Sequence, residues 1–286
     1  MDAFLRIGGM TVAVRCDGKR VRCNWEDPFR RFLVDTPGKV DLDLRVDLAS
    51  SLPTGDGQLL FDSDSVWRMF RTADGYRLEC RSEAFGDTPY KVALIDDDFT
   101  QGTILLREDH ADLHPLDYPL DEVLIAHLLG RGRGVELHSC GVIDRQGRGH
   151  LFVGVSGAGK STTARLWGDA AAGIVSDDRV IVCEQDGAMW MYGTPWHGEA
   201  ELAMASGVPL HGVYLLVQSE QNALLPLSHA HAVARLFGCT FPLFYDAAAV
   251  DFTVSFLARL AASVRVRELF FRRDPSVVDL VLAGAA

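Results

Sequence analysis

Residues 149–167 read GHLFVGVSGAGKSTTARLW, and this stretch decides the fold of the second half of the chain. Its first five residues, Gly149 to Val153, are a short, largely apolar run, which predicts a buried strand. Residues 154–159 contain three glycines, which is typical of a tight turn. The residues from Lys160 onward continue as a helix. The stretch therefore predicts a strand, a glycine-rich loop and a helix in direct succession.

The loop fits the pattern G-x-x-x-x-G-K-[ST], in which glycines let successive backbone N–H groups point inward toward an anion. The helix that follows adds its positive amino-terminal end. Lys160 is expected to reach the β and γ phosphates of ATP, and the Ser161 hydroxyl to bind Mg²⁺. A turn that binds nothing is the alternative, but both flanks and the Lys-Ser-Thr run favour a nucleotide site. The predicted nucleotide-binding residues are Gly154, Ser156, Gly157, Ala158, Gly159, Lys160, Ser161 and Thr162.

Two neighbouring carboxylates, Asp177 and Asp178, follow residues 172–176, which resemble a short buried strand. Neighbouring side chains on a strand point to opposite faces, so both reach one site only if the strand ends there and the backbone turns. We therefore expect different roles: one carboxylate holds Mg²⁺, and the other accepts the proton of an attacking hydroxyl. The alternative is an acidic turn exposed to water.

His138 lies one predicted strand upstream of the loop and faces the phosphates if the two strands are adjacent. A single histidine on a strand is more often structural, so the residue alone leaves both roles open. Arg179, directly after the aspartates, either stabilises a transferring phosphoryl group or pairs with those aspartates.

The rest of the chain predicts two regions. In residues 40–48 apolar and charged side chains alternate without exception, as in a half-buried strand. Further strands are expected near 66–72, 76–82, 89–95 and 102–107, with a hairpin turn at Asp74-Gly75, and a helix between Pro119 and Gly130. We predict an α+β fold: an N-terminal, mainly antiparallel sheet region over residues 1–130, which would orient the acceptor, followed by an α/β domain over residues 131–286 that holds the loop.

In that second region, strands are expected near 135–143, 149–154, 173–176, 179–184, 188–193 and 212–218. Helices are expected near 160–169, 229–238, 250–262 and 275–283.

Composition excludes several classes of protein. The formal net charge of −11 disfavours a nucleic-acid partner. No apolar stretch is long enough to span a membrane and the amino terminus lacks a secretory signal pattern, so we expect no membrane partner and a cytoplasmic location. The six cysteines show no zinc-ligand spacing and are expected to be reduced and mostly buried.

His138, the loop 154–162 and the pair Asp177-Asp178 resemble, in order and near spacing, the catalytic domain of HPr kinase/phosphorylase. The loop also resembles that of phosphoenolpyruvate carboxykinase, which shares that domain's fold. The whole chain is similar to the shorter HPr kinase-like proteins, which include lasso peptide kinases.

The resemblance implies a catalytic domain of the HPr kinase/phosphoenolpyruvate carboxykinase type. It makes Lys160 and Ser161 the phosphate and Mg²⁺ residues, Asp177 the base, Asp178 the metal-side carboxylate and His138 a site residue. In the stretch 192–199, it also suggests Glu199 or His197 on the metal or acceptor side.

The function expected on these grounds is transfer of the γ phosphoryl group of Mg-ATP to a serine of a peptide or small protein, with a lasso-type precursor peptide as the favoured acceptor. HPr itself is not expected, because the basic C-terminal motif that binds it is missing. Two alternatives stay open: a catalytically silent nucleotide-binding module, and an enzyme acting on a small metabolite as a kinase or carboxykinase.

Overall fold

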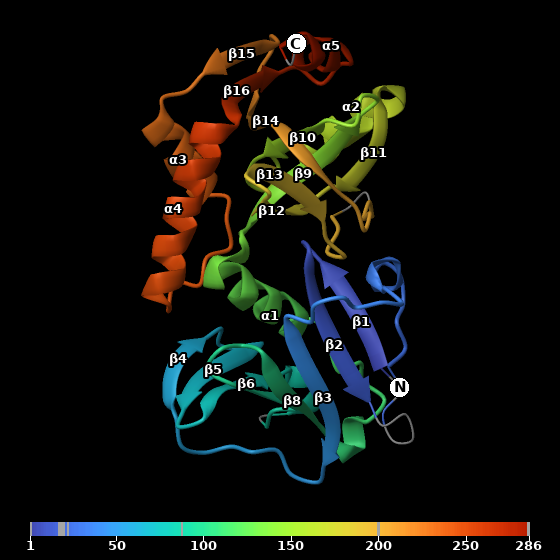
Figure 1. The fold of residues 1–286 in the computed structure, drawn as a ribbon, viewed down its shortest axis with the longest axis vertical. Coiled ribbons are helices and arrows are strands. Elements are labelled where there is room, and N and C mark those ends of the chain that lie inside the picture. The colour runs from blue at the N-terminus through green and yellow to red at the C-terminus, as the bar shows by residue number, and fades with distance from the viewer. Residues whose placement is uncertain (1, 17–20, 22, 87, 199–200, 285–286) are drawn as a thin grey trace. The chain divides into compact units, whose positions relative to one another are not determined.

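The computed structural model describes residues 2–16, 21, 23–86, 88–198 and 201–284. Contacts between Cα atoms divide the chain into two compact units. The first comprises Met1–Arg6 and Met10–Leu128, and the second comprises Ile7–Gly9 and Leu129–Ala286. Figure 1 colours the chain from blue at its amino terminus to red at its carboxyl terminus. No helix among the described residues is long and apolar enough to cross a membrane.

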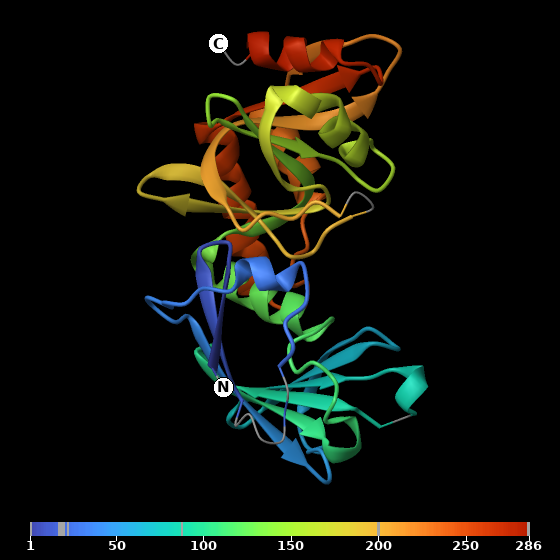
Figure 2. The same ribbon diagram turned by 90° about the vertical axis from the view of Figure 1, so that its right-hand side faces the viewer.

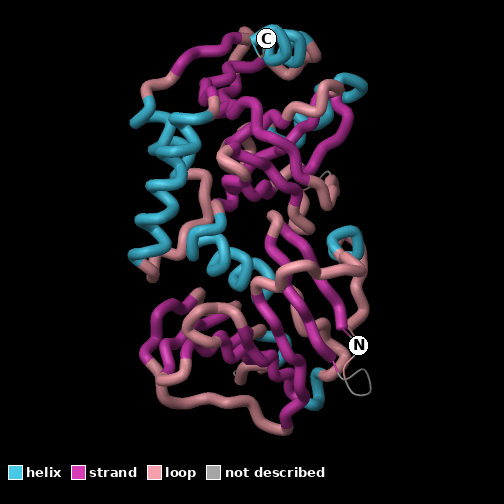
Figure 3. The backbone as a smooth tube through the Cα atoms, viewed as in Figure 1, coloured by secondary structure: helices cyan, strands magenta, loops and turns pink. Residues whose placement is uncertain are grey.

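The first unit is built on one eight-stranded sheet with the strand order β1-β2-β3-β8-β7-β6-β5-β4. Figure 3 shows its strands in magenta. Its elements are β1 (Asp2–Ile7), β2 (Met10–Cys16), β3 (Leu42–Ala49), β4 (Gln58–Asp62), β5 (Trp67–Thr72), β6 (Gly75–Cys80), β7 (Lys91–Ile95), β8 (Gln101–Arg107) and α1 (Leu120–Leu128).

The alternating stretch forms β3 as predicted, with Leu42, Leu44 and Val46 buried on one face. Its pairing differs from the antiparallel prediction, because β3 runs parallel to both β2 and β8. Strands β4 to β8 pair antiparallel. Alternation reports which face of a strand is buried and not its direction, and the long connections on either side of β3 permit a parallel crossover.

The predicted hairpin turn at Asp74-Gly75 is confirmed, because β5 and β6 pair antiparallel with Thr72 opposite Gly75. Gly75 has φ +136°, and a Cβ atom there would lie 2.1 Å from the carbonyl oxygen of Ile95. A side chain therefore has no room at this position, which explains the glycine.

The cysteine prediction is wrong for one pair, since Cys16 and Cys23 are joined by a disulfide. The other four cysteines are free, and Cys80, Cys140 and Cys183 are buried as expected. A disulfide depends on how close two cysteines lie in space, which motif spacing does not report.

The second unit holds a seven-stranded path with the order β10-β9-β12-β13-β14-β16-β15, and β11 pairs with β9. Its elements are β9 (Val135–Asp144), β10 (Gly149–Val153), β11 (Ala171–Ser176), β12 (Arg179–Gln185), β13 (Ala188–Gly193), β14 (Gly207–Gln218), β15 (Ala223–Pro226), β16 (Arg265–Phe271), α2 (Lys160–Trp167), α3 (His229–Phe237), α4 (Ala247–Ser263) and α5 (Ser276–Gly284).

Strand β10 lies inside this sheet, antiparallel to β9 and parallel to β14. Leu151 and Val153 pack in a core with α3 and α4, whereas Phe152 packs in a second core with α2 and α5. Helices therefore cover both faces of the strand that leads into the glycine-rich loop. Figure 2 shows the same elements from a second direction.

Candidate functional site

The glycine-rich loop occupies residues 154–159, between the end of β10 and the start of α2. Gly157 and Gly159 have φ values of +79° and +109°, which only glycine adopts without strain. The Gly154 N–H donates to the carbonyl oxygen of His138 at 3.2 Å and ties the loop to β9. Within the described ranges, no group accepts a hydrogen bond from the N–H of Gly157, Gly159 or Ser161. These donors remain available to an anion.

The loop's last glycine is also held by packing, and we predict a large stability cost when it gains a side chain. A Cβ atom on Gly159 would lie 2.4 Å from Cζ of Phe271, which is 1% exposed. The strained φ and the overpacking together are expected to lower the free energy of unfolding of Gly159→Ala by about 2–4 kcal/mol. Urea denaturation measures this change.

The matched control is Gly147→Ala, because Gly147 also has a positive φ (+78°) but no atom within 4 Å of the added Cβ. It isolates the backbone cost, about 1 kcal/mol. Equal losses in the two variants would contradict the packing argument.

Lys160, His138 and Asp178 come together beside the loop, although they belong to α2, β9 and the turn between β11 and β12. The Lys160 Nζ lies 2.7 Å from His138 Nε2 and 3.7 Å from Asp178 Oδ1. His138 Nε2 is 2.9 Å from the same Asp178 oxygen. His138 pairs with Arg179 across β9 and β12, which places the histidine next to the aspartate turn.

In this cluster the partly buried positive charges of Lys160 and Arg179 lie close to the negative charge of Asp178. Burial lowers the pKa of Lys160, and the nearby Asp178 charge opposes that shift. The hydrogen bond from His138, helped by the charges of Lys160 and Arg179, lowers the pKa of Asp178. One ring nitrogen cannot accept a hydrogen bond from Lys160 and donate one to Asp178 at the same time, so Nε2 of His138 serves one of these partners at a time. An anion at Lys160 would leave His138 to Asp178.

Asp177 has different surroundings from its neighbour. It is 1% exposed, and its Oδ1 accepts the N–H of Gly198 at 2.9 Å. The Ser176 hydroxyl accepts the N–H groups of Asp178 and Arg179 at 3.2 and 3.1 Å, which turns the backbone. The predicted end of the strand before the two aspartates is confirmed, since β11 ends at Ser176.

The remaining predicted nucleotide-binding residues belong to the loop itself and to the first turn of α2. Ser156 and Gly157 are exposed, Ala158 is half-buried, and Ser161 and Thr162 are half-buried in the first turn of α2. Glu199 lies outside the described residues. His197 is exposed, with its Nδ1 3.1 Å from the carbonyl oxygen of Gly198.

The donors suit magnesium in kind. A hydroxyl at Ser161 and the carboxylates of Asp177 and Asp178 are oxygen ligands, which Mg²⁺ prefers. Among the described residues, no three His, Cys, Asp or Glu side chains group as a metal cage. Because Mg²⁺ is usually held by one or two carboxylates with waters and substrate phosphates, these residues fit an ion that arrives with a nucleotide.

Two site neighbours were not predicted from the sequence. Gln218, at the end of β14, donates through Nε2 to the carbonyl oxygen of Gly157 at 2.7 Å. Phe241 lies with its ring centroid 6.1 Å from that of His138. The sequence could have indicated Gln218, because it ends a predicted strand, and parallel strands such as β10 and β14 end at the same edge of a sheet. No sequence pattern indicates Phe241, since its position depends on the path of the chain after α3.

A buried hydrogen bond between a histidine and a carboxylate fixes the strand that enters the loop. His150 on β10 is fully buried, and its Nε2 lies 3.0 Å from Oδ2 of Asp144, which is 1% exposed. Asp144 also accepts the Nε–H of Arg148 at 2.8 Å. Burial raises the pKa of Asp144, but the hydrogen bonds of His150 and Arg148 outweigh it and bring the pKa to about 2. Burial lowers the pKa of His150, against the opposing effect of Asp144.

Both shifts predict that acid destabilises this unit. A group whose pKa is lower in the folded than in the unfolded chain contributes stability above its unfolded pKa and loses it as pH falls through the folded value. His150 therefore weakens the fold below about pH 6.5, and Asp144 does so below about pH 4.

In His150→Gln, we expect the free energy of unfolding to decrease less between about pH 7 and 5 than it does in the wild type. Urea titrations at several pH values measure it, with exposed His231→Gln as the unchanged control. A slope equal to that of the wild type in His150→Gln would rule out the effect.

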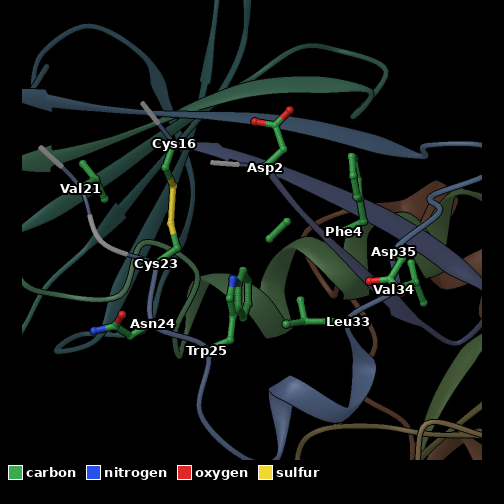
Figure 4. A pocket seen from close by; sticks show the side chains of 11 residues that line it. Asp2, Phe4, Cys16, Val21, Cys23, Asn24, Trp25, Leu33, Val34 and Asp35 are labelled. Atoms are coloured by element: carbon green, nitrogen blue, oxygen red, sulfur yellow. A yellow bond between two sulfur atoms is a disulfide. The ribbon is translucent and has the colours of Figure 1, made fainter. Parts of the chain in front are cut away.

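The first unit contains a separate pocket of about 450 Å³. Phe4, Trp25, Leu33 and Val34 line it together with the Cys16–Cys23 disulfide, as Figure 4 shows. It contains none of the residues predicted for the nucleotide site.

Comparison with known proteins adds no assignment: the sequence matches no protein-family model and no curated protein.

Proposed function

We propose that this chain is an ATP-dependent serine kinase of the HPr kinase-like type that phosphorylates a peptide or small protein, with a lasso-type precursor peptide as the favoured acceptor. One observation carries the proposal: Lys160 at the end of the glycine-rich loop lies 2.7 Å from His138 and 3.7 Å from Asp178. A loop lysine that can bind phosphates and a carboxylate that can hold Mg²⁺ are parts that phosphoryl transfer uses, and His138 links the two here.

In the proposed reaction the loop N–H groups and Lys160 bind the phosphates of ATP. Lys160 now donates to the carbonyl oxygens of Gly154 and Val155 at 3.2 and 3.4 Å, and it would exchange these weak contacts for phosphate oxygens. The serine oxygen forms a bond to the γ phosphorus, and the bond from that phosphorus to ADP breaks. The serine proton passes to Asp177. Mg²⁺, held by Ser161 and Asp178, would neutralise phosphate charge.

A nucleotide-binding module without catalysis is the second candidate, and one contact favours it. The Asp177 carboxylate is 1% exposed and already accepts the Gly198 N–H at 2.9 Å, which is unusual for a base that must meet an incoming hydroxyl. No contact among the described residues favours the other alternative, an enzyme that acts on a small metabolite.

We place the kinase in the cytoplasm, where ATP is supplied. The Cys16–Cys23 disulfide is the observation against this location, because cytoplasmic thiols are normally kept reduced.

The test is incubation of the purified protein with Mg-ATP and serine peptides, including any precursor peptide encoded beside it, with mass spectrometry to detect an added phosphate. Phosphorylation of one serine supports the kinase. Nucleotide binding without transfer to any acceptor contradicts it and favours the silent module.

A further inference from the structure

Phe241 is an aromatic side chain fixed beside the proposed catalytic cluster but left 38% exposed. It lies in the connection between α3 and α4. The carbonyl oxygen of Cys239 accepts the N–H of His138 at 2.8 Å, and Thr240 forms a bridge to Leu137. The two residues directly before Phe241 are thus tied to β9, and this anchors the ring beside that strand.

Arg179 covers part of this ring. Its guanidinium carbon lies 4.4 Å from the ring centroid of Phe241, a cation–π contact. Glu136, which is 5% exposed, holds the same guanidinium with an N–O distance of 3.3 Å. Arg179 and Phe241 therefore form a rigid surface, which we call the Arg179–Phe241 platform.

The platform and the loop contact different oxygen atoms of the Asp178 carboxylate. Lys160 approaches Oδ1 of Asp178 at 3.7 Å, whereas Arg179 approaches Oδ2 at 3.8 Å. The Asp178 carboxylate thus lies between the phosphate-binding lysine and the platform. The nucleobase of a bound nucleotide is at the opposite end of the triphosphate from the reacting phosphorus, which leaves the platform to the acceptor.

We propose that the Arg179–Phe241 platform binds the acceptor peptide by holding an apolar or aromatic side chain next to the reacting serine. This rests on the proposed kinase function. An exposed aromatic ring gains free energy when another apolar side chain covers it, and its rigid backbone means that little entropy is lost on binding. The platform selects among serines by the residue beside them.

The test uses synthetic peptides with one central serine flanked by Phe, Leu, Gly or Asp, phosphorylated with Mg-ATP. For the wild type we expect kcat/KM to be about tenfold higher with Phe or Leu than with Gly. Phe241→Ala should remove this preference through a raised KM for the peptide, with the dissociation constant for ATP unchanged. Phe241→Tyr keeps the ring and should restore the preference.

Phe244→Ala is the matched control, because Phe244 is 74% exposed in the same connection and should leave the preference intact. Wild-type phosphorylation without any flanking preference would overturn the platform and leave the kinase standing, and so would a preference that survives in Phe241→Ala. Weaker ATP binding in Phe241→Ala would also overturn it, by assigning the ring to the nucleobase. Mg-ATP binding without phosphorylation of any peptide would contradict the kinase itself, and the platform with it.

Discussion

Lys160→Ala is expected to reduce phosphoryl transfer by about three orders of magnitude. Lys160 is 6% exposed, and its ammonium group lies within hydrogen-bond distance of His138 and the loop carbonyl oxygen of Gly154. A desolvated charge interacts strongly with phosphate oxygens, and no other lysine is close to the loop in sequence. Initial rates with a peptide that the wild type phosphorylates measure the loss.

The fold should survive this substitution, because burial already lowers the pKa of Lys160 and its charge is costly to keep. Lys160→Met is the companion variant, since it keeps most of the apolar stem and removes the charge. Lys39→Ala provides the matched control: its side chain is 83% exposed, and its loss should change the rate less than twofold. Near-normal transfer by Lys160→Met would show that the loop does not bind the reacting phosphates.

The sequence predicted the elements around the loop well, because each rests on local signals. Glycines, a lysine and an apolar run report a turn, a helix start and a buried strand without help from distant residues. A role for His138 was predicted only on condition that its strand lies beside the strand that enters the loop, and β9 and β10 do pair. The pairing of β9 with β12, which brings His138 opposite Arg179, was not predicted. Single strands do not encode their neighbours, so the approach of His138 to Lys160 needed the structure.

Two kinds of feature escaped the sequence for the same reason. The short strand β15, with four residues, is too brief for a period to appear. The platform residue Phe241 stands in an irregular connection, where an exposed aromatic side chain has no pattern to mark it. In both cases long-range contacts decide the structure, whereas periodicity and motif spacing describe only local preference.

Asp177→Asn is expected to lower the rate of transfer by about 10²- to 10⁴-fold while ATP binds as before. The amide oxygen of asparagine can still accept the Gly198 N–H, which Asp177 now accepts at 2.9 Å, so the local geometry should persist. The negative charge and the ability to take a proton are lost. Steady-state rates and ATP binding by calorimetry separate the two effects.

Asp178→Asn is the comparison that divides the roles of the two carboxylates. Asp178 contacts His138 and Lys160, and its charge is expected to support Mg²⁺, so this variant should need more Mg²⁺ for the same rate. If Asp178→Asn loses the rate and Asp177→Asn keeps it, the proton acceptor is the 28% exposed Asp178. Asp177 would then be a structural carboxylate that holds the segment around Gly198 in place. Because that buried hydrogen bond survives the asparagine substitution, a loss of rate in Asp177→Asn without a loss of stability points to proton transfer.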